Sequence, residues 1–175
     1  GPDRIVSALA NFKGGNRRFE IKGEVAGMRG VDDYAHHPTE VAAVLETARS
    51  QSHKRLIAVF QPHRFSRTAR CFKKFARVLS VADVVVLTDI FSAGESPISG
   101  VTAGRLADAV RQETDRPVHH AGTLDEALAL VSDVAWSGDL VVTLGAGSIG
   151  GLGDRLLAAR QKAVDAGCRP GSEIS

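Results

Sequence analysis

The sequence is poor in cysteine and in aromatic residues, and each shortage excludes a class of protein. Its two cysteines, Cys71 and Cys168, lie far apart and form no Cys-x-x-Cys pair. This argues against a disulfide framework and against a cysteine zinc site, and it favours a reducing, cytoplasmic location. Phenylalanine, tyrosine and tryptophan together make up 5% of the 175 residues, which is few for a surface that stacks nucleic-acid bases.

The chain also lacks a strong net charge and long hydrophobic runs. Its formal net charge is +2, although charged residues make up 24% of the chain, so charge alone predicts neither nucleic-acid binding nor membrane binding. No apolar run is long enough to span a bilayer, and we find no signal-peptide pattern. With 43% hydrophobic residues, the composition is that of one α/β domain with room for a short appendage.

Short apolar runs alternate with amphipathic stretches along most of the chain. We expect buried strands at 56–60, 83–88, 117–120 and 140–144, because short continuous apolar runs are typical of parallel strands. Helices are expected at 3–11, 38–48, 64–79, 102–113, 123–131 and 155–164. A β-hairpin is expected where 19–22 and 28–32 flank a glycine-containing turn. The pattern predicts an α/β fold: a doubly wound, mostly parallel, Rossmann-like sheet with helices on both faces and an N-terminal β-hairpin.

The two ends of the sequence differ from its centre. Residues 12–18 form a glycine-rich basic link, which is typical of a domain boundary. We therefore expect 1–15 to end a preceding domain, with Gly1 and Pro2 as a cloning remnant, and 16–166 to form the domain itself. Residues 167–175 are expected to be a disordered tail.

The densest group of polar side chains is the stretch 31–40, which contains two aspartates, a tyrosine and two histidines. Pro38 fits the first turn of a helix, and Glu40 suits the positive end of the helix dipole. The polar cluster is therefore expected between a strand and a helix N-terminus, where ligands bind in α/β sheets. Asp32 and Asp33 have two alternative predicted roles: they cap the turn, or they contact a ligand hydroxyl or Mg²⁺.

A second polar stretch, 60–70, leaves the next predicted strand and begins a helix. Arg64 and Arg67 are three residues apart and so share a face of the first helical turn. Cations at this end of a helix oppose its dipole, and such a local conflict favours a functional anion site for carboxylate or phosphate. The alternative is a solvent-exposed basic face that pairs with Asp or Glu elsewhere.

Histidines and glycines also stand at the predicted strand ends. The spacing of His36, His37 and His63 matches no zinc signature, so we predict no metal ligation by protein residues. Residues 145–150 match Gly-x-Gly-x-x-Gly between a strand and a helix, which by itself indicates a dinucleotide site. Because no further strand completes the βαβ unit, we favour a tight turn that borders the ligand cleft. An NAD-binding domain and a non-catalytic nucleotide- or anion-binding Rossmann-like module stay as alternatives.

Several of these motifs occur together, in this order, in one known family. They are the segments 17–20, 32–40, 60–68, 93–100 and 145–147. Over residues 3–165 the chain resembles the C-terminal domain of the Mur ligases, the ATP-dependent amide ligases of peptidoglycan synthesis. The motif of Gln61, Pro62, His63 and Arg64 resembles the branch that joins L-alanine to UDP-N-acetylmuramate, and not the branch that recycles murein tripeptide.

The resemblance implies a three-domain enzyme of which this chain is the last domain. An N-terminal domain would bind UDP-N-acetylmuramate, and a central ATPase domain would carry the phosphate loop. Residues 3–11 of this chain resemble the last helix of that central domain. This chain contains no Gly-x-x-x-x-Gly-Lys-[Ser/Thr], so ATP and Mg²⁺ would be bound mainly by the central domain. The muramoyl carboxylate would become an acyl phosphate that the amine of L-alanine attacks. The partners are these substrates and the other two domains, with neither nucleic acid nor membrane insertion, and the chain alone is expected to be inactive.

The resemblance also assigns roles to individual residues. The amino-acid site would be lined by Tyr34, His36, His63, Arg64 and Arg67. Within it, Arg64 and Arg67 would bind the alanine carboxylate, and His36 would be the catalytic group. Asp33 resembles the position that reaches the nucleotide ribose. Ser148 departs from the family, in which many relatives have an acid after Gly-Ala-Gly, so a metal or phosphate role for 145–148 stays open.

Overall fold

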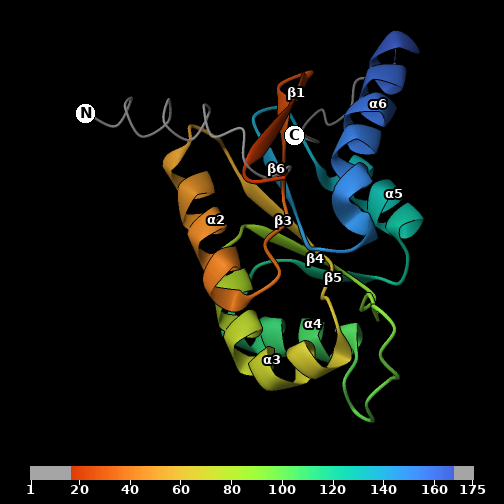
Figure 1. Ribbon diagram of the computed structural model, residues 1–175. Helices are drawn as coiled ribbons and strands as arrows, with labels where there is room; N and C mark the ends of the chain where they lie inside the picture. Colours follow the sequence, from red (N-terminus) through yellow and green to blue (C-terminus); the bar gives the residue numbers. More distant parts are fainter. Residues whose placement is uncertain (1–16, 168–175) are drawn as a thin grey trace.

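The computed structural model describes residues 17–167, which form a six-stranded sheet between two layers of helices (Figure 1). The strands are β1 (Glu20–Val25), β2 (Met28–Asp33), β3 (Leu56–Phe60), β4 (Val84–Thr88), β5 (Val118–Ala121) and β6 (Leu140–Leu144). The helices are α2 (Pro38–Ser50), α3 (Phe65–Leu79), α4 (Ala103–Glu113), α5 (Leu124–Val134) and α6 (Leu152–Asp165), with a short 3₁₀ helix η1 (Ser148–Gly151). Within 17–167, none of the helices has the length and apolarity needed to cross a lipid bilayer. The expected helix at 3–11, most of the link at 12–18 and nearly all of the tail at 167–175 lie outside the described residues.

The strand order in the sheet is β1-β2-β6-β3-β4-β5. β1 pairs with β2 in antiparallel orientation, and the other four neighbouring pairs are parallel. The predicted doubly wound, mostly parallel sheet and its N-terminal hairpin are therefore confirmed. The last strand in the sequence, β6, lies between β2 and β3 near the middle of the sheet, a position that the sequence pattern did not predict.

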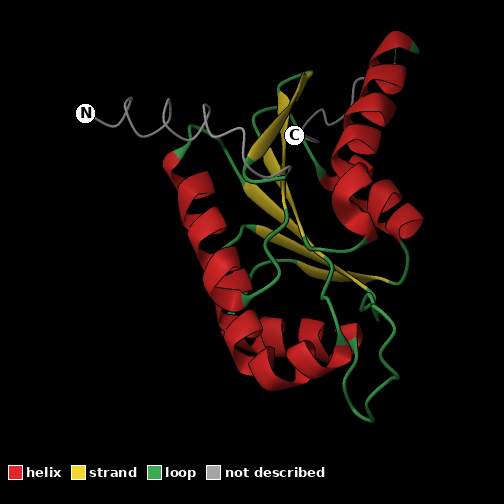
Figure 2. Cartoon of the chain, viewed as in Figure 1, coloured by secondary structure: helices red, strands yellow, loops and turns green. Residues whose placement is uncertain are grey.

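Helices cover both faces of the sheet (Figure 2). Successive side chains of a strand point to opposite faces, and the two cores separate accordingly. In β3, Ala58 and Phe60 pack with residues of α2, α3 and α4, whereas Ile57 and Val59 pack with residues of α5 and α6. Because all five residues of β3, β4 and β6 are buried, these strands read as continuous apolar runs.

Some element boundaries differ from the predicted ones. In the hairpin, β1 continues to Val25, and the turn consists of Ala26 and Gly27, whose φ angles of 48° and 75° are both positive, as a tight two-residue hairpin turn requires. Helix α6 begins at Leu152, three residues before the predicted start, because η1 leads directly into it. Helix α3 begins at Phe65, and Arg64 is its N-cap.

The face of the sheet on which the following helix packs changes between β6 and its two neighbours. The helices that follow β2 and β3 lie on one face of the sheet, whereas α6, which follows β6, lies on the other. This makes the carboxyl ends of β2, β6 and β3 the topological switch point of the sheet. Ligands of open α/β sheets bind at such a point, and both polar stretches of the sequence leave the sheet there, after β2 and after β3.

Candidate functional site

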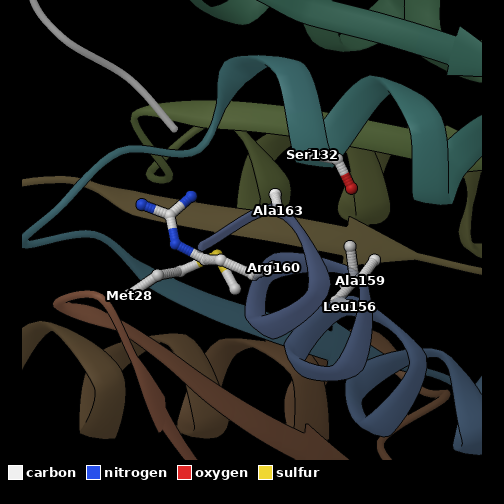
Figure 3. Close-up of a pocket in the computed structure, with 6 residues that line it drawn as sticks. All are labelled: Met28, Ser132, Leu156, Ala159, Arg160 and Ala163. Carbon is white, nitrogen blue, oxygen red and sulfur yellow. The ribbon is translucent and has the colours of Figure 1, made fainter. Parts of the chain in front are cut away.

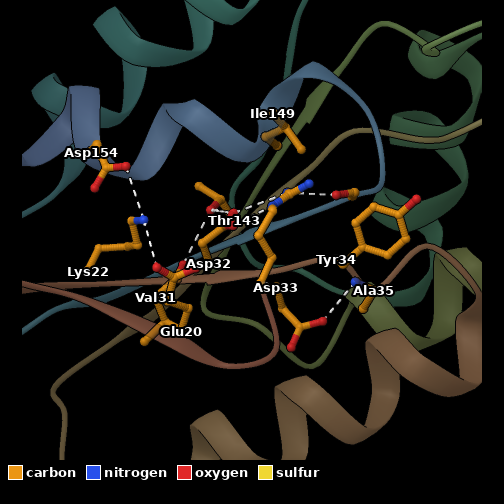
Figure 4. Close-up of polar contacts among 12 residues, drawn as sticks. Glu20, Lys22, Val31, Asp32, Asp33, Tyr34, Ala35, Thr143, Ile149 and Asp154 are labelled. Atoms are coloured by element: carbon orange, nitrogen blue, oxygen red, sulfur yellow. Dashed lines mark hydrogen bonds and ion pairs between the residues drawn. The ribbon is translucent and has the colours of Figure 1, made fainter. Parts of the chain in front are cut away.

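Asp32 near the end of β2 is a fully buried carboxylate with three donors. Arg17 donates to it from Nε at 2.6 Å and from Nη2 at 3.3 Å, and the hydroxyl of Thr143 on β6 donates at 2.6 Å. The exposed fraction of Asp32 is 0%, and a buried charge is stable only when it is paired and hydrogen-bonded. Figure 4 shows the contact between Asp32 and Thr143, which joins the neighbouring strands β2 and β6. Asp32 therefore has a structural role.

Asp33, the last residue of β2, caps the turn that follows it. Its Oδ1 accepts a hydrogen bond from the backbone N–H of Ala35 at 2.7 Å, and its Oδ2 accepts one from Phe19 at 2.6 Å. Burial raises the pKa of Asp33, although these two hydrogen bonds act in the opposite direction. The geometry agrees with the turn-capping alternative for this residue. Its contact with a nucleotide ribose stays a prediction.

Tyr34 and His36 form a pair at the surface of this turn. Tyr34 is 46% exposed, and the centroids of the two rings lie 5.2 Å apart in an edge-to-face arrangement. Nδ1 of His36 lies 2.9 Å from the carbonyl oxygen of Tyr34. Because a carbonyl oxygen only accepts, Nδ1 carries the hydrogen and donates it. In the neutral ring the lone pair is therefore on Nε2.

His37 and Glu40 build the start of α2. His37 is the N-cap, and its Nδ1 accepts a hydrogen bond from the backbone of Thr39. The carboxylate of Glu40 accepts hydrogen bonds from the backbone N–H groups of His36 at 3.0 Å and His37 at 3.1 Å. Burial raises the pKa of Glu40, but the two N–H groups outweigh it and the pKa is lowered. His37 is thus a capping residue, and Pro38 stands in the first helical turn as predicted.

His63 follows β3 and faces His36, with ring centroids 5.8 Å apart. On its other side it stacks on Phe91 at 5.5 Å. Arg67 places Nη1 3.1 Å from Nδ1 of His63, and because a guanidinium has no acceptor, Nδ1 must accept and the ring hydrogen is on Nε2. Burial and the positive charge of Arg67 lower the pKa of His63. The ring is therefore a neutral donor beside His36.

The N-terminus of α3 has an anion from the chain itself. Glu95 accepts hydrogen bonds from the backbone N–H of Ser66 at 2.9 Å and from its hydroxyl at 2.7 Å. Its Oε1 also lies 3.9 Å from Nη1 of Arg64. This arrangement agrees with the alternative prediction for the basic face, in which its arginines pair with an acidic residue elsewhere in the chain. Binding of a substrate carboxylate by Arg64 and Arg67 stays a prediction.

The glycine-rich loop after β6 packs closely against Gln61 and is hydrogen-bonded to its side chain. The side chain of Gln61 accepts from the backbone N–H of Ile149 and donates to the hydroxyl of Ser148, both at 3.1 Å. A Cβ added at Gly147 would lie 2.6 Å from Oε1 of Gln61, and Gly145 has a φ of 148°. Close packing and backbone conformation thus explain the glycines. The predicted turn is a short bend that leads into the 3₁₀ helix η1, and its place beside a ligand cleft stays a prediction.

Comparison with known proteins agrees with this geometry. The family described as Mur ligase, glutamate ligase domain, matches residues 17–147. The chain belongs to the Mur ligase family. It is 46% identical, over 90% of its length, to the UDP-N-acetylmuramate–L-alanine ligase of Nitratidesulfovibrio vulgaris, and 45% identical, also over 90%, to that of Rubrobacter xylanophilus. The match covers 35% and 36% of those proteins, so the chain spans about a third of their length.

Solved structures place this Mur ligase chain as a C-terminal domain. The UDP-N-acetylmuramate–alanine ligase of Thermotoga maritima superposes with a TM-score of 0.70 at 25% identity, over 91% of this chain and 33% of that one. A domain of a Haemophilus ducreyi protein described as a UDP-N-acetylmuramate:L-alanyl-γ-D-glutamyl-meso-diaminopimelate ligase matches with a TM-score of 0.61 at 25% identity, over 82% of this chain and 99% of that one. The α/β fold is confirmed, and a related domain has been crystallised without the rest of its enzyme.

The Mur ligase site combines predicted and unpredicted residues. Tyr34, His36, His63 and Arg67 form one continuous set of contacts, whereas Arg64 lies towards Glu95. Sequence reasoning gave no role to Arg17 or Phe91, which hold Tyr34 and His63. The sequence offered only weak signals for them. Arg17 belongs to the family segment 17–20, and Phe91 is one of few aromatic residues and lies in a predicted loop. Among residues 17–167 no group of three or more His, Cys, Asp or Glu side chains is arranged to hold a metal ion.

A small cavity lies elsewhere, between α5 and α6 (Figure 3). It has a volume of about 100 Å³ and is lined by Met28, Ser132, Leu156, Ala159, Arg160 and Ala163. Met28 begins β2 whereas Asp33 ends it, so the cavity and the polar cluster are at opposite ends of that strand. Arg160 is buried there and donates to the carbonyl oxygens of Val25 and Ala135. The cavity is therefore separate from the candidate site.

Proposed function

We propose that this chain is the amino-acid-binding domain of an ATP-dependent UDP-N-acetylmuramate–L-alanine ligase, with the domain itself at 16–166. The observation that carries the proposal is the continuous set of Tyr34, His36, His63 and Arg67 at the switch point of the sheet. The names of relatives that are 46% and 43% identical to this chain support it. The reaction would join L-alanine to the muramoyl carboxylate through an acyl phosphate.

The carboxylate of L-alanine is assigned to Arg64 and Arg67. Planar guanidinium groups bind a carboxylate by two parallel charge-assisted hydrogen bonds. Nη1 of Arg64 lies 3.9 Å from Glu95, a distance too long for a hydrogen bond, so a substrate carboxylate can compete for this guanidinium. Arg67 keeps further N–H groups besides the one that faces His63, because a guanidinium carries five.

The amine of L-alanine is assigned to His36. It must lose a proton before or as it attacks the acyl phosphate. The lone pair on Nε2 of His36 is the acceptor left free when Nδ1 donates to the carbonyl oxygen of Tyr34. The Nε2–H of His63, on the neighbouring ring, is a donor that helps to orient the substrate. Holding the amine against the acyl phosphate is the main catalytic gain of such a domain.

ATP and Mg²⁺ are assigned to the part of the enzyme outside this chain. The sequence has no phosphate loop, and residues 17–167 offer no cluster of metal-binding side chains. Asp33 is proposed to face the nucleotide ribose across the domain boundary. UDP-N-acetylmuramate and the other two domains are the further partners. A cytoplasmic location is part of the proposal, since the buried Cys71 is a free thiol.

Kinetics of the complete enzyme test this assignment. Arg67→Ala removes a charge-assisted hydrogen bond and should raise the KM for L-alanine by about tenfold to a hundredfold, with the KM for ATP nearly unchanged. His36→Ala should mainly lower kcat. Arg70→Ala is the matched control, because Arg70 lies one turn further along α3 and is exposed. A changed KM for ATP with an unchanged KM for L-alanine would show that the arginines face the nucleotide.

Phosphate release gives a second measurement. The complete wild-type enzyme should release phosphate only when UDP-N-acetylmuramate, L-alanine and ATP are all present. Release that requires another amino acid and does not occur with L-alanine would contradict the proposal and favour a different amino-acid substrate. No release at all would favour the non-catalytic nucleotide- or anion-binding alternative.

A further inference from the structure

Arg17 connects three parts of the candidate site that are distant in the sequence. Its Nε donates to Asp32 at the end of β2, and its Nη2 donates to the carbonyl oxygen of Gly145 at 2.8 Å, after β6. Its guanidinium also lies 5.5 Å from the ring centroid of Tyr34. The side chain therefore clamps the ends of two neighbouring strands together and supports an aromatic ring of the site.

The main chain of Arg17 extends this connection to His36. Its carbonyl oxygen accepts a hydrogen bond from the backbone N–H of Tyr34 at 2.7 Å. The carbonyl oxygen of Tyr34 in turn accepts from Nδ1 of His36. The φ of Arg17 is 69°, a left-handed conformation that residues with a Cβ rarely adopt. Its side chain is held at the same time by hydrogen bonds to Asp32 and Gly145.

We propose that Arg17 is a positioning residue of the amino-acid site. By holding the peptide of Tyr34, it fixes the carbonyl group that sets the tautomer of His36 and leaves Nε2 of that ring free to accept a proton. The inference rests on the proposed function for the role of His36, but the link from Arg17 to Tyr34 and His36 can be measured without any catalysis.

The chain contains a second clamp that serves as a matched control. Arg55 donates to the buried Asp139 from Nε at 3.1 Å and from Nη2 at 2.6 Å, and to the carbonyl oxygen of Val134 at 2.8 Å. Its guanidinium lies 4.3 Å from the ring centroid of Trp136. Asp139 precedes β6 whereas Gly145 follows it. The two clamps have the same chemistry at opposite ends of one strand, and only that of Arg17 contacts the candidate site.

The first test compares Arg17→Lys with Arg55→Lys in the complete enzyme. Both variants keep the positive charge and lose the planar fork, so both should lower the Tm. Arg17→Lys should raise the KM for L-alanine or lower kcat by about tenfold, whereas Arg55→Lys should change either constant by less than about twofold. Equal, small effects of the two variants on both constants would overturn the proposal, since the clamp would then be only structural.

A milder pair of variants tests the same link without removing an arginine. A Cβ added at Gly150 would lie 2.6 Å from the guanidinium carbon of Arg17, whereas one added at Gly151 would have no atom within 4 Å. Gly150→Ala should therefore displace Arg17 and change the kinetics in the same direction as Arg17→Lys. Gly151→Ala should have no effect. If the two glycine variants behave alike, the proposal is wrong.

Spectroscopy separates this inference from the proposed function. Tyr34 is the single tyrosine of the 175-residue chain, so 3-fluorotyrosine gives one fluorine resonance in the isolated chain. The ¹⁵N signals of its labelled histidines, with that of His36 assigned by its loss in His36→Gln, report the tautomer of His36. Arg17→Lys should shift the fluorine signal and reduce the Nδ1–H tautomer, and Arg55→Lys should leave both unchanged. Unchanged spectra in Arg17→Lys would overturn the proposal. Expected spectra from the isolated wild-type chain, together with no alanine-dependent turnover by the complete enzyme, would contradict the proposed function alone.

Discussion

Arg67 donates a hydrogen bond from Nη1 to Nδ1 of His63 across 3.1 Å, one turn of α3 away. Because Nδ1 of His63 accepts this hydrogen bond, the ring hydrogen is on Nε2. Burial lowers the pKa of His63 most, and the positive charge of Arg67 lowers it further. The arginine that is proposed to bind the substrate carboxylate therefore also contributes to the lowered pKa of the neighbouring histidine. Its loss would change the charge of the site as well as its affinity.

The titration of His63 should follow from this contact. We expect its pKa below 6.5, since burial and Arg67 both lower it, and we expect Arg67→Ala to raise it. Because the unfolded chain binds this proton more readily, the free energy of unfolding should fall as the pH decreases from about 6.5 towards the pKa in the folded state. Histidine NMR titrations of the wild type and the variant check the shift. An identical pKa in both would contradict the contact.

Removal of the carboxylate of Asp33 should destabilise the domain. Asp33→Ala leaves two backbone N–H groups, those of Phe19 and Ala35, without their acceptor. The loss of two hydrogen bonds to a charged group should lower the free energy of unfolding by about 3 kcal/mol or more. Urea denaturation measures this value, with the exposed Asp115→Ala as the control. A loss below about 1 kcal/mol would show that the turn does not depend on Asp33.

The isolated chain should fold without the rest of the enzyme. It has two cores of its own, one on each face of the sheet, and the domain from Haemophilus ducreyi was crystallised alone. Circular dichroism should show one cooperative thermal transition, with an enthalpy on the order of 100 kcal/mol for a domain of this size. A broad transition without a defined midpoint would indicate that the core is incomplete.

The isolated chain should nevertheless not turn over ATP. Catalysis of phosphoryl transfer depends on positioning and neutralising the γ-phosphate, and the sequence contains no phosphate loop. Phosphate release should stay at background when the purified chain is mixed with UDP-N-acetylmuramate, L-alanine, ATP and Mg²⁺. Release above background that survives Arg67→Ala would indicate a contaminating ATPase. Release that is lost in Arg67→Ala would contradict the prediction.

Local sequence patterns were sufficient for most of the fold. The strands β3, β4 and β6 are continuous apolar runs because both faces of each are buried, and such runs are visible without any tertiary information. The position of β6 between β2 and β3 was not visible. It depends on pairing between residues such as Leu56 and Leu140, which are far apart in the sequence.

The same distinction explains which parts of the candidate site were predicted. The polar stretches that hold Tyr34, His36 and His63 are local, and their place after a strand was readable. The bond from Arg17 to Gly145 joins residues 128 positions apart, and the capping of Ser66 by Glu95 joins residues 29 apart. The conflict between Arg64 and the helix dipole was therefore recognised, whereas the anion that relieves it was not.

The position of β6 has a consequence for the synthesis of the protein. On the ribosome β6 is made after every other strand of the sheet, yet β2 and β3 both pair with it. Until residues 140–144 have emerged, the facing edges of β2 and β3 stay unpaired, and unpaired strand edges are templates for pairing with other chains. We expect the sheet to close only after β6 has emerged, so that a product that stops before Leu140 aggregates instead of folding.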